Sequence, residues 1–408
     1  MSKSSPLTTQ SIWQRGERDG DLSCDVAVVG GGIVGASTAY WLKRGAPDMD
    51  VILLEADEPA SGASGRNAGF LLQGTSADYM SDIQTHGSDR ARRLWHFSQE
   101  NRDLIAGELS PRAFEFEASG SLTVAGTAEE DERLRRCVSK MRADGFPAAY
   151  ISAAETNRRL VGRGFHGSLY VASGAMLNPV RLVNHIVEKS GARLLSHHPV
   201  LAIADGAEGV DLETTKRRVR ARQVVLALNA YLPLLLPALS PYVQPIRAQM
   251  LATEPASSRW LQLPAYSHEG FYYVRQRADG VVLVGGARHL HMLEERGYAD
   301  QTTPALQADL EKFLHQHFPQ TRGLAVARRW SGVMGFSPDG LPVVGEVPHL
   351  SGSYFATGFT GHGMGYGFRF GRLLAEMIRR GRRATDADLF LADRFSDLPR
   401  SSLRAVSR

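Results

Sequence analysis

The sequence predicts an α/β protein with two domains, the first of them Rossmann-like. Three observations lead to this fold class. Residues 25–55 combine a strand, a glycine-rich turn, a helix and a second strand that ends in an acid, and residues 354–380 contain another strand, glycine loop and helix. The chain has 408 residues, which is too long for one ordinary hydrophobic core.

The first stretch begins with Val26–Val29, an apolar run with β-branched residues that is typical of a strand buried on both faces. The alanine-rich residues after the glycines predict a helix that extends to about Lys43. A second buried strand is predicted at Val51–Leu54, and Glu55 ends it.

The glycines between strand and helix follow G-x-G-x-x-G spacing at Gly30, Gly32 and Gly35. They allow, in turn, a tight turn, close approach of backbone to a pyrophosphate, and packing of helix on strand. The helix N-terminus offers N–H groups and a positive dipole end to phosphates. Glu55 can accept hydrogen bonds from an adenosine ribose. The stretch therefore predicts dinucleotide binding, and a glycine-rich turn that only packs is the alternative.

Composition describes a globular protein, with 43% hydrophobic and 22% charged residues and a net charge of +4. The basic residues are scattered, so no nucleic-acid partner is expected. Cys24 and Cys137 form neither a disulfide framework nor a C-x-x-C metal pattern, so no metal is expected. The polar N-terminus lacks a signal peptide, and no apolar run is long enough for a membrane span. We expect a cytoplasmic protein.

Two further segments are expected to contact a cofactor. Ser61–Phe70 is rich in small residues, and it could wrap the second half of a long cofactor with Arg66 near phosphate. The alternative is an ordinary flexible connection. Val224–Tyr231 is a buried run that ends in small residues and suits a position against a cofactor.

The remaining chain predicts alternating helices and strands. Helices are expected at 77–109, 129–144, 180–190, 305–318 and 368–380, and strands at 114–124, 193–213, 219–228, 245–253, 271–277 and 281–286. The Asp279-Gly280 turn joins the last two strands into a hairpin.

Taken together, these pieces resemble the FAD-dependent D-amino acid oxidase, glycine oxidase and sarcosine oxidase family. The likeness extends from about Asp25 to Arg380. The matching motifs are Val28–Gly35, Gly62–Gly69, Trp330–Gly332, Pro338–Pro342 and Gly358–Gly363. Asn229–Tyr231 and Ala252–Pro255 look most like its γ-glutamylputrescine oxidase branch.

The resemblance implies an FAD domain assembled from 22–76, 165–235 and 330–385. It implies a substrate domain on an antiparallel sheet from 77–164 and 236–329, with terminal extensions at 1–21 and 386–408. The implied activity is oxidation of the C–N bond of an amine or amino acid by hydride transfer to flavin N5, with H2O2 as a product.

The motifs of the family place the FAD contacts along the whole chain. The expected contacts are Gly30, Gly32, Ile33, Val34, Gly35, Glu55, Ala63, Ser64, Arg66, Asn67, Ala68, Gly69, Val200, Asn229, Gly332, Gly361, His362, Gly363 and Met364.

The chain departs from the family at several functional positions. Met334 stands where glycine oxidases have a carboxylate-binding arginine, and no arginine occurs in Gly358–Gly363. The oxygen-activating lysine of sarcosine oxidases is absent from Val281–Val284, and Gly365 replaces another lysine. No cysteine lies near Trp330 to link the flavin. We therefore expect non-covalent FAD, and an amine or N-substituted amine rather than a simple α-amino acid.

Three residues are candidates for catalysis or substrate contact. Strand alternation puts Tyr273 and Arg275 on one face, and the alternative is a half-buried strand with an exposed arginine. His362 lies in the second glycine loop, where it can contact the flavin ring or handle a proton; packing of the loop is the alternative.

Other functions remain open at this point. An oxidase would use O2, whereas a dehydrogenase of the same family would pass electrons to a quinone or carrier. A nicotinamide-binding dehydrogenase, or a non-catalytic binding protein, could use the same glycine motif. The sequence does not predict an oligomeric state.

Overall fold

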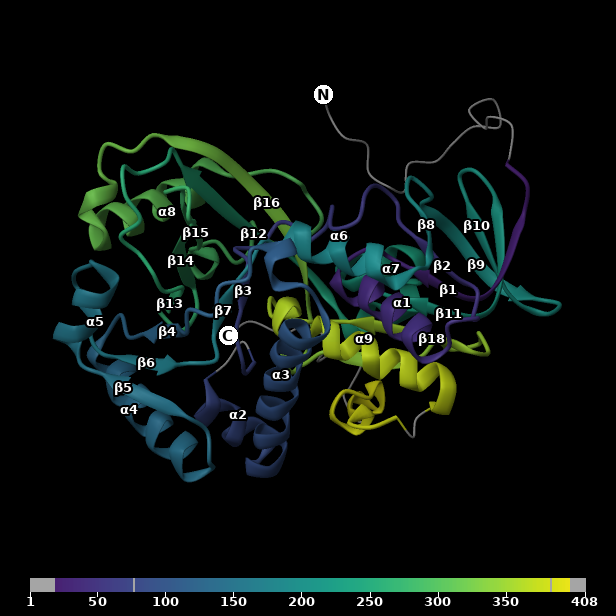
Figure 1. Ribbon diagram of the computed structural model, residues 1–408, viewed down its shortest axis with the longest axis horizontal. Coiled ribbons are helices and arrows are strands. Elements are labelled where there is room, and N and C mark those ends of the chain that lie inside the picture. The colour runs from purple at the N-terminus through teal and green to yellow at the C-terminus, as the bar shows by residue number, and fades with distance from the viewer. Residues whose placement is uncertain (1–18, 76–77, 382–383, 397–408) are drawn as a thin grey trace. The chain divides into compact units, whose positions relative to one another are not determined.

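The computed structural model describes residues 19–75, 78–381 and 384–396 (Figure 1). The chain divides into two compact units. The first comprises Met1–Gly65, Val180–Pro245 and Met334–Arg408, and the second comprises Arg66–Pro179 and Ile246–Val333. Each unit has its own large sheet.

The sheet of the first unit has the strand order β17-β18-β11-β1-β2-β8, and all neighbours from β18 to β8 are parallel. β9 and β10 continue from β11 as antiparallel strands, and β17 is antiparallel to β18. The order changes direction between β1 and β11, so the carboxyl ends of these strands form the expected ligand site of an open α/β sheet. The strands are β1 (Leu22–Val29), β2 (Val51–Leu54), β8 (Arg193–Leu195), β9 (Val200–Gly206), β10 (Gly209–Thr214), β11 (Arg218–Leu226), β17 (Val343–Glu346) and β18 (Ser353–Thr357).

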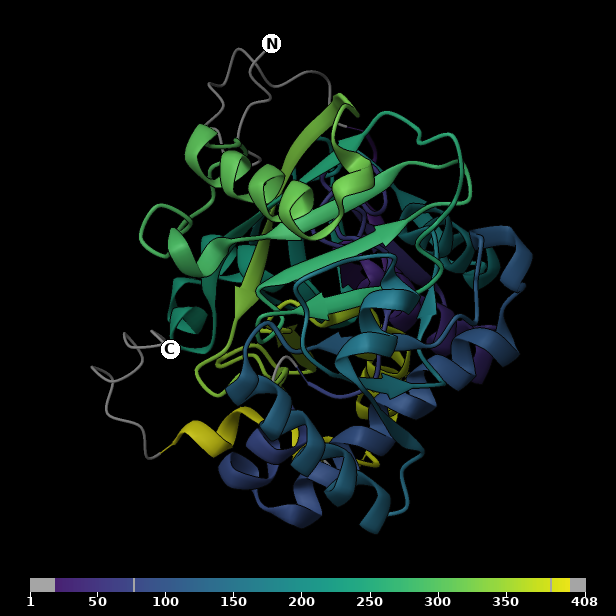
Figure 2. The same ribbon diagram turned by 90° about the vertical axis from the view of Figure 1, so that its left-hand side faces the viewer.

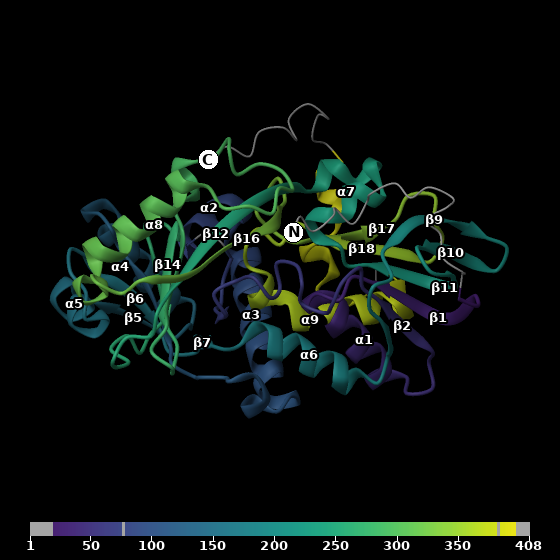
Figure 3. The ribbon, with the colours of Figure 1, turned by 90° about the horizontal axis from the view of Figure 1, so that it is seen from above.

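Two helices of this unit, α1 (Ile33–Gly45) and α9 (Gly363–Arg380), lie side by side in Figures 1 and 3. Gly367 packs on Ile33, and a side chain at Gly371 would collide with Ser37. The matched steps of four residues show that the helices run parallel, so both N-termini lie at the same end. The other helices here are α6 (Pro179–Ser190) and α7 (Leu232–Leu235).

The second unit is built on a largely antiparallel sheet with the order β16-β12-β15-β14-β13-β4-β6-β5, in which only the β13–β4 pair of the described pairs is parallel. β3 and β7 form a separate antiparallel pair. The strands are β3 (Phe70–Leu71), β4 (Ser121–Val124), β5 (Ala148–Ile151), β6 (Ser168–Val171), β7 (Ala175–Met176), β12 (Gln244–Thr253), β13 (Ala265–Ser267), β14 (Tyr272–Gln276), β15 (Val282–Gly286) and β16 (Val326–Phe336).

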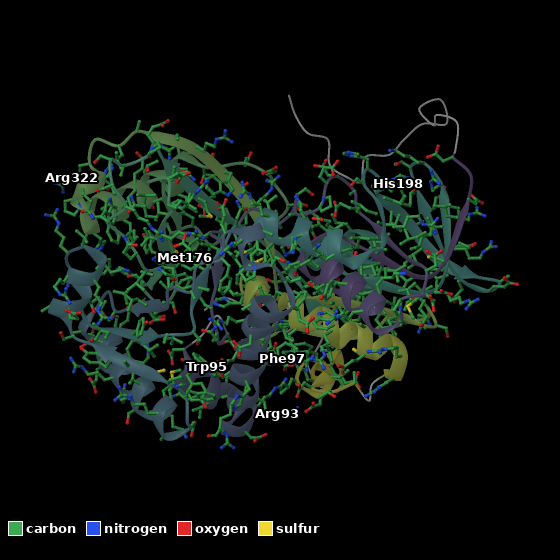
Figure 4. All side chains as sticks on the ribbon, in the orientation of Figure 1. Arg93, Trp95, Phe97, Met176, His198 and Arg322 are labelled. Carbon is green, nitrogen blue, oxygen red and sulfur yellow. The ribbon has the colours of Figure 1, made fainter. Side chains whose placement is uncertain are left out.

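Helices pack against this sheet, and two hydrophobic cores lie between them and the strands. Figure 2 shows α8 (Pro304–His317), in light green, lying across the strands, and its Leu310 and Phe313 pack with Val274 and Val284. The second core contains Trp95 of α3, which Figure 4 labels. Its helices are α2 (Tyr79–His86), α3 (Ser88–Glu108) and α4 (Ala128–Ala143), and α5 (Ala153–Leu160) follows. Over the described ranges, none of the helices is long and apolar enough to cross a bilayer.

The two-domain α/β class predicted from the sequence is confirmed, but three elements differ. The helix expected at 77–109 is two helices, because Gly87 between them has φ +84°. Of 114–124 only β4 pairs as a strand, because Pro111–Phe114 is a 3-10 turn followed by a left-handed Glu115. α9 begins five residues earlier than expected, since its glycines pack on α1.

The predicted domain boundaries also differ from the compact units. Residues 66–76 and 165–179 were assigned to the FAD domain, yet 66–75 and 165–179 belong to the second unit. The reason is local, because β3 pairs with β7 inside that unit. Most of the predicted terminal extensions, 1–18 and 397–408, lie outside the described residues. The functional domain assignment stays a prediction.

Candidate functional site

The glycine turn after β1 has the geometry expected of a dinucleotide site. Gly30 has φ +108°, and a Cβ there would lie 2.6 Å from the carbonyl oxygen of Ala227. A Cβ at Gly35 would collide with the carbonyl oxygen of Gly30. Both positions therefore accept only glycine, and the chain passes from β1 into α1 through a tight turn in which Gly32 is half-buried.

Glu55 lies beside this turn, at the carboxyl end of β2. Its Oε2 accepts a hydrogen bond from the Gly31 N–H at 2.6 Å, and its Oε1 accepts from the Asp57 N–H at 2.9 Å and the Ser61 hydroxyl at 3.4 Å. Because the two oxygens of a carboxylate offer about four lone-pair sites, Glu55 retains acceptor capacity for ribose hydroxyls.

Val200, another expected contact, starts β9 close to this acid. The N–H of His198, a residue that Figure 4 labels, donates to the Glu55 carbonyl oxygen at 2.8 Å. The chain therefore turns from β8 past Glu55 into β9, which brings the half-buried Val200 to the same edge of the sheet.

The N-terminus of α1 is suited to an anion. Ser64 accepts a hydrogen bond from the Ile33 N–H at 2.9 Å, whereas the N–H groups of Val34 and Gly35 find no acceptor within the described residues. The first turn contains no acidic residue that would occupy the positive dipole end. Together with Glu55, this end of the sheet fits a pyrophosphate and a ribose, and Ala63 precedes Ser64 in the loop that meets the Ile33 N–H.

The second glycine loop is held by Asn229, which follows β11. The amide oxygen of Asn229 accepts from the Gly358 N–H at 3.1 Å, and its carbonyl oxygen accepts from the Thr357 hydroxyl at 2.9 Å. The neighbouring strands β11 and β18 are thereby joined at their carboxyl ends. Asn229, expected as a cofactor contact, has a definite structural task in positioning the loop.

His362 closes that loop and caps α9, ahead of Gly363 and Met364. The residue is half-buried, and loss of solvation lowers the pKa of its imidazole to about 4. The ring is therefore neutral near pH 7, and one nitrogen can accept a proton. Met334 and Gly361 are neighbours: a Cβ at Gly361 would lie 3.5 Å from the Met334 sulfur. Met334 and the Gly358–Gly363 loop, the two places where glycine oxidases were expected to have an arginine, are therefore neighbours.

In the second unit, Arg66 makes its described contacts with side chains and backbone of that same unit. Its Nη1 donates to Asp300 Oδ1 at 2.7 Å and to the Ser331 carbonyl at 3.0 Å. The Trp330 indole donates to the Arg66 carbonyl at 2.9 Å. A Cβ at Gly332 would lie 3.1 Å from Arg66 Cβ, so Gly332 makes room for this arginine. The proposed phosphate contact of Arg66 is not among these interactions.

Tyr273 lies on an aromatic face of the sheet. Its ring centroid is 5.8 Å from that of Tyr266 and 6.3 Å from that of Phe70. The ring also covers Gly285 on β15, where any side chain would collide with it. Burial raises the pKa of the Tyr273 hydroxyl to about 12, so it remains a donor near neutral pH. Within the described residues this hydroxyl has no hydrogen-bond partner.

Arg275 does not take the exposed position that strand alternation left open for it. The side chain is buried, with 5% exposure. Its Nη1 donates to the carbonyl oxygens of Ala68, Gly69 and Leu177 at 3.1, 2.9 and 2.9 Å. Burial lowers the pKa of the guanidinium to about 10, so it stays charged. The role of Arg275 as a substrate contact stays a prediction, but its Nη1 is already occupied by backbone carbonyl oxygens.

Three contacts were missed by sequence reasoning. Ser64 was expected as an FAD contact, but nothing local shows that its hydroxyl meets the Ile33 N–H. Trp330 was treated as a motif marker, not as a donor to Arg66. Gly285 could have been found, because the Asp279-Gly280 turn sets the hairpin register that places it opposite Tyr273.

Comparison with protein families gives one match over most of the chain. A family profile described as FAD dependent oxidoreductase matches residues 25–377. Gamma-glutamylputrescine oxidoreductase of Escherichia coli (strain K12) is 28% identical over 397 residues, which covers 93% of this chain and 87% of that protein.

Other relatives extend this result. Glycine oxidase of Geobacillus kaustophilus (strain HTA426) is 26% identical over 373 residues, covering 89% of this chain and 94% of that protein. The crystal structure of glycine oxidase from Geobacillus kaustophilus superimposes with a TM-score of 0.77 at 22% identity, covering 91% of this chain and 98% of the other. At that identity, the structural likeness establishes the fold.

Proposed function

The chain belongs to the family of FAD-dependent oxidoreductases, and from this premise we propose that it oxidises the C–N bond of an amine or an amino acid. Membership makes the protein an enzyme with FAD as its cofactor, so the nicotinamide-binding and the non-catalytic alternatives are set aside. The substrate class is supported by the relatives, whose names specify gamma-glutamylputrescine and glycine.

The observation that carries the proposal is the arrangement around Glu55 and the N-terminus of α1. Glu55 keeps unused acceptor sites beside the Gly30 turn, and the N–H groups of Val34 and Gly35 have no acceptor within the described residues. We propose that these groups hold the ribose and pyrophosphate of FAD, with Gly30, Gly32 and Ile33 lining the turn. FAD bound there would supply the acceptor for the hydride of the C–N bond.

Further FAD contacts are proposed from sequence position. In the first unit they belong to the loops around Glu55, Asn229 and α9, and in the second unit to the segment after Gly65. The residues are Ala63, Ser64, Val200, Asn229, Gly361, His362, Gly363 and Met364, and separately Arg66, Asn67, Ala68, Gly69 and Gly332.

Retention of FAD is proposed to be non-covalent. Burial raises the pKa of both thiols, Cys24 and Cys137, to about 12, so neither forms the reactive thiolate at neutral pH. Each packs in a hydrophobic core that does not contain Trp330. The free cysteines also support a cytoplasmic location, which fractionation of the producing cells would test.

For the substrate, we propose a hydrogen bond from the Tyr273 hydroxyl and a proton-accepting role for His362. The tyrosine is a protonated donor on an aromatic face, and the histidine is neutral near pH 7. Met334 beside Gly361 leaves a thioether where glycine oxidases have a cation. Because a buried carboxylate without a cation costs several kcal/mol, we propose an amine substrate over a small α-amino acid.

The test is anaerobic mixing of the purified yellow protein with a panel of substrates while the flavin absorbance is followed. A primary or secondary amine, including one with a distant acidic end, should bleach the flavin faster than glycine, sarcosine or D-alanine. If D-alanine or glycine is fastest, the argument from Met334 is wrong. If no amine or amino acid bleaches it, the proposed reaction is wrong.

A dehydrogenase that passes electrons to a quinone or carrier remains the second candidate. It is favoured by one observation, that β14, β15 and their turn contain no lysine, the residue that sarcosine oxidases use on this hairpin to activate oxygen. Reoxidation of the reduced protein by O2 and by a soluble quinone, compared in the same instrument, separates the two. Rapid reoxidation by O2 with H2O2 release supports the oxidase.

A further inference from the structure

We infer that Arg275 is a positioning residue, which holds the backbone of residues 66–69 in the form that retains FAD. The inference rests on the proposed function, in which this segment contacts the cofactor.

Three backbone carbonyl groups converge on one nitrogen of Arg275. Its Nη1 donates to the carbonyl oxygens of Ala68, Gly69 and Leu177, all within 3.1 Å. The Gly69 carbonyl also accepts from the Leu177 N–H at 2.9 Å. The segment 66–69 and Leu177, which follows β7, are thereby tied to β14, although they lie far apart in the sequence.

Gly69 is shaped around this contact. Its φ is +73°, and a Cβ there would lie 2.7 Å from Arg275 Nη1 and would collide with the Leu177 carbonyl. Its N–H donates to the Asn67 side-chain oxygen at 2.7 Å, which closes a tight turn within the segment. The left-handed backbone, the Leu177 carbonyl and Arg275 Nη1 together leave room only for glycine at this position.

The other end of the segment is held in the same direction. The Trp330 indole N–H donates to the Arg66 carbonyl oxygen. The carbonyl oxygens of Arg66, Ala68 and Gly69 therefore all point to donors on the sheet of the second unit. In a trans peptide the N–H points opposite to the C=O. The Asn67 N–H, which belongs to the same peptide as the Arg66 carbonyl, therefore faces away from Trp330.

A comparison with Arg247, on strand β12 of the same sheet, separates positioning from simple stability. Arg247 is also buried, but its Nε and Nη2 donate to the Glu295 carboxylate at 2.9 and 2.7 Å, so its charge is balanced. Arg275 has three carbonyl dipoles instead, and its Nε is buried without a partner in the described part of the chain. A buried cation without a carboxylate partner contributes little to the free energy of unfolding. The effect of Arg275 is instead to fix the backbone of residues 66–69.

The experiment measures FAD binding to apoprotein by fluorescence quenching, together with the thermal midpoint of each apoprotein. Arg275→Met should raise the Kd for FAD by about tenfold or more, and Arg275→Lys should raise it less, because an ammonium can reach some of the carbonyls. Trp330→Phe, which removes only the indole donor, should give a smaller rise. The matched control, Arg247→Met, should lower the thermal midpoint while the Kd stays within about twofold of wild type.

The results decide between the alternatives. A folded Arg275 variant that binds FAD as wild type does overturns the inference. So does an equal rise of Kd in Arg247→Met, since that would mean general loosening of the unit. If Arg275→Met does not fold, Arg275→Lys and Trp330→Phe are judged by the same criterion. A wild-type protein that takes up no FAD would instead overturn the proposed function. That outcome differs from every outcome that overturns the role of Arg275.

Discussion

Replacement of Glu55 tests the most specific part of the cofactor site. In wild type, the carboxylate holds the Gly31 N–H at 2.6 Å and the Asp57 N–H at 2.9 Å, and its remaining lone pairs are the proposed acceptors for ribose hydroxyls. Glu55→Ala removes all of these acceptors, whereas Glu55→Gln keeps one neutral oxygen. Hydrogen bonds to charged groups contribute about 1.5–3 kcal/mol, so Glu55→Ala should raise the Kd for FAD by about 10- to 150-fold. Glu55→Gln should show a smaller rise.

The assay is titration of apoprotein with FAD and, separately, with FMN, which lacks the adenosine. FMN binding serves as the internal control, because the ribose contact cannot contribute to it. The reasoning is refuted if Glu55→Ala binds FAD within about twofold of wild type. It is also refuted if FAD and FMN lose affinity equally, since the acid would then act only by holding the Gly31 turn.

Three further predictions follow from the described contacts. The His362 pKa lies near 4 in the folded protein, below its usual value near 6.5, so the unfolded chain binds more protons between these values and stability falls as pH falls through that window. His362→Gln should remove about 1 kcal/mol of that acid loss, after the discount for partial exposure, in urea unfolding compared at pH 7 and pH 5; an unchanged difference would contradict the lowered pKa. Gly371→Ala should lower the free energy of unfolding by about 1–3 kcal/mol, because the added methyl meets the Ser37 and Thr38 backbone, and this outweighs the gain of about 1 kcal/mol in helix propensity. Denaturation followed by filtration should release all yellow colour from the protein, and colour that stays with the chain would mean a covalent link.

Local patterns were sufficient to predict the first glycine turn. Gly30, Gly35 and Glu55 belong to one short stretch whose strand, helix and acid repeat a common geometry, and the structure places them as expected. The family and its cofactor were also predicted correctly from motifs of this kind.

Long-range partners could not be predicted in the same way. Alternation on β14 assigns Arg275 to the face of Tyr273, but it contains no information about the carbonyl oxygens that meet the side chain there. The start of α9 was misplaced for a related reason. A glycine-rich run has low helix propensity and reads as a loop, yet the close fit of Gly367 on Ile33 needs those glycines within the helix.

The strand order of the first sheet has a consequence for synthesis of the protein on the ribosome. β1 leaves the ribosome early, but its neighbour β11 ends at Leu226, and α9, the partner of α1, ends at Arg380. Until then one edge of β1 is unpaired and one face of α1 is uncovered, which favours aggregation of an incomplete chain. An incomplete chain therefore exposes the edge of β1 that β11 pairs with and the face of α1 that α9 covers in the finished protein.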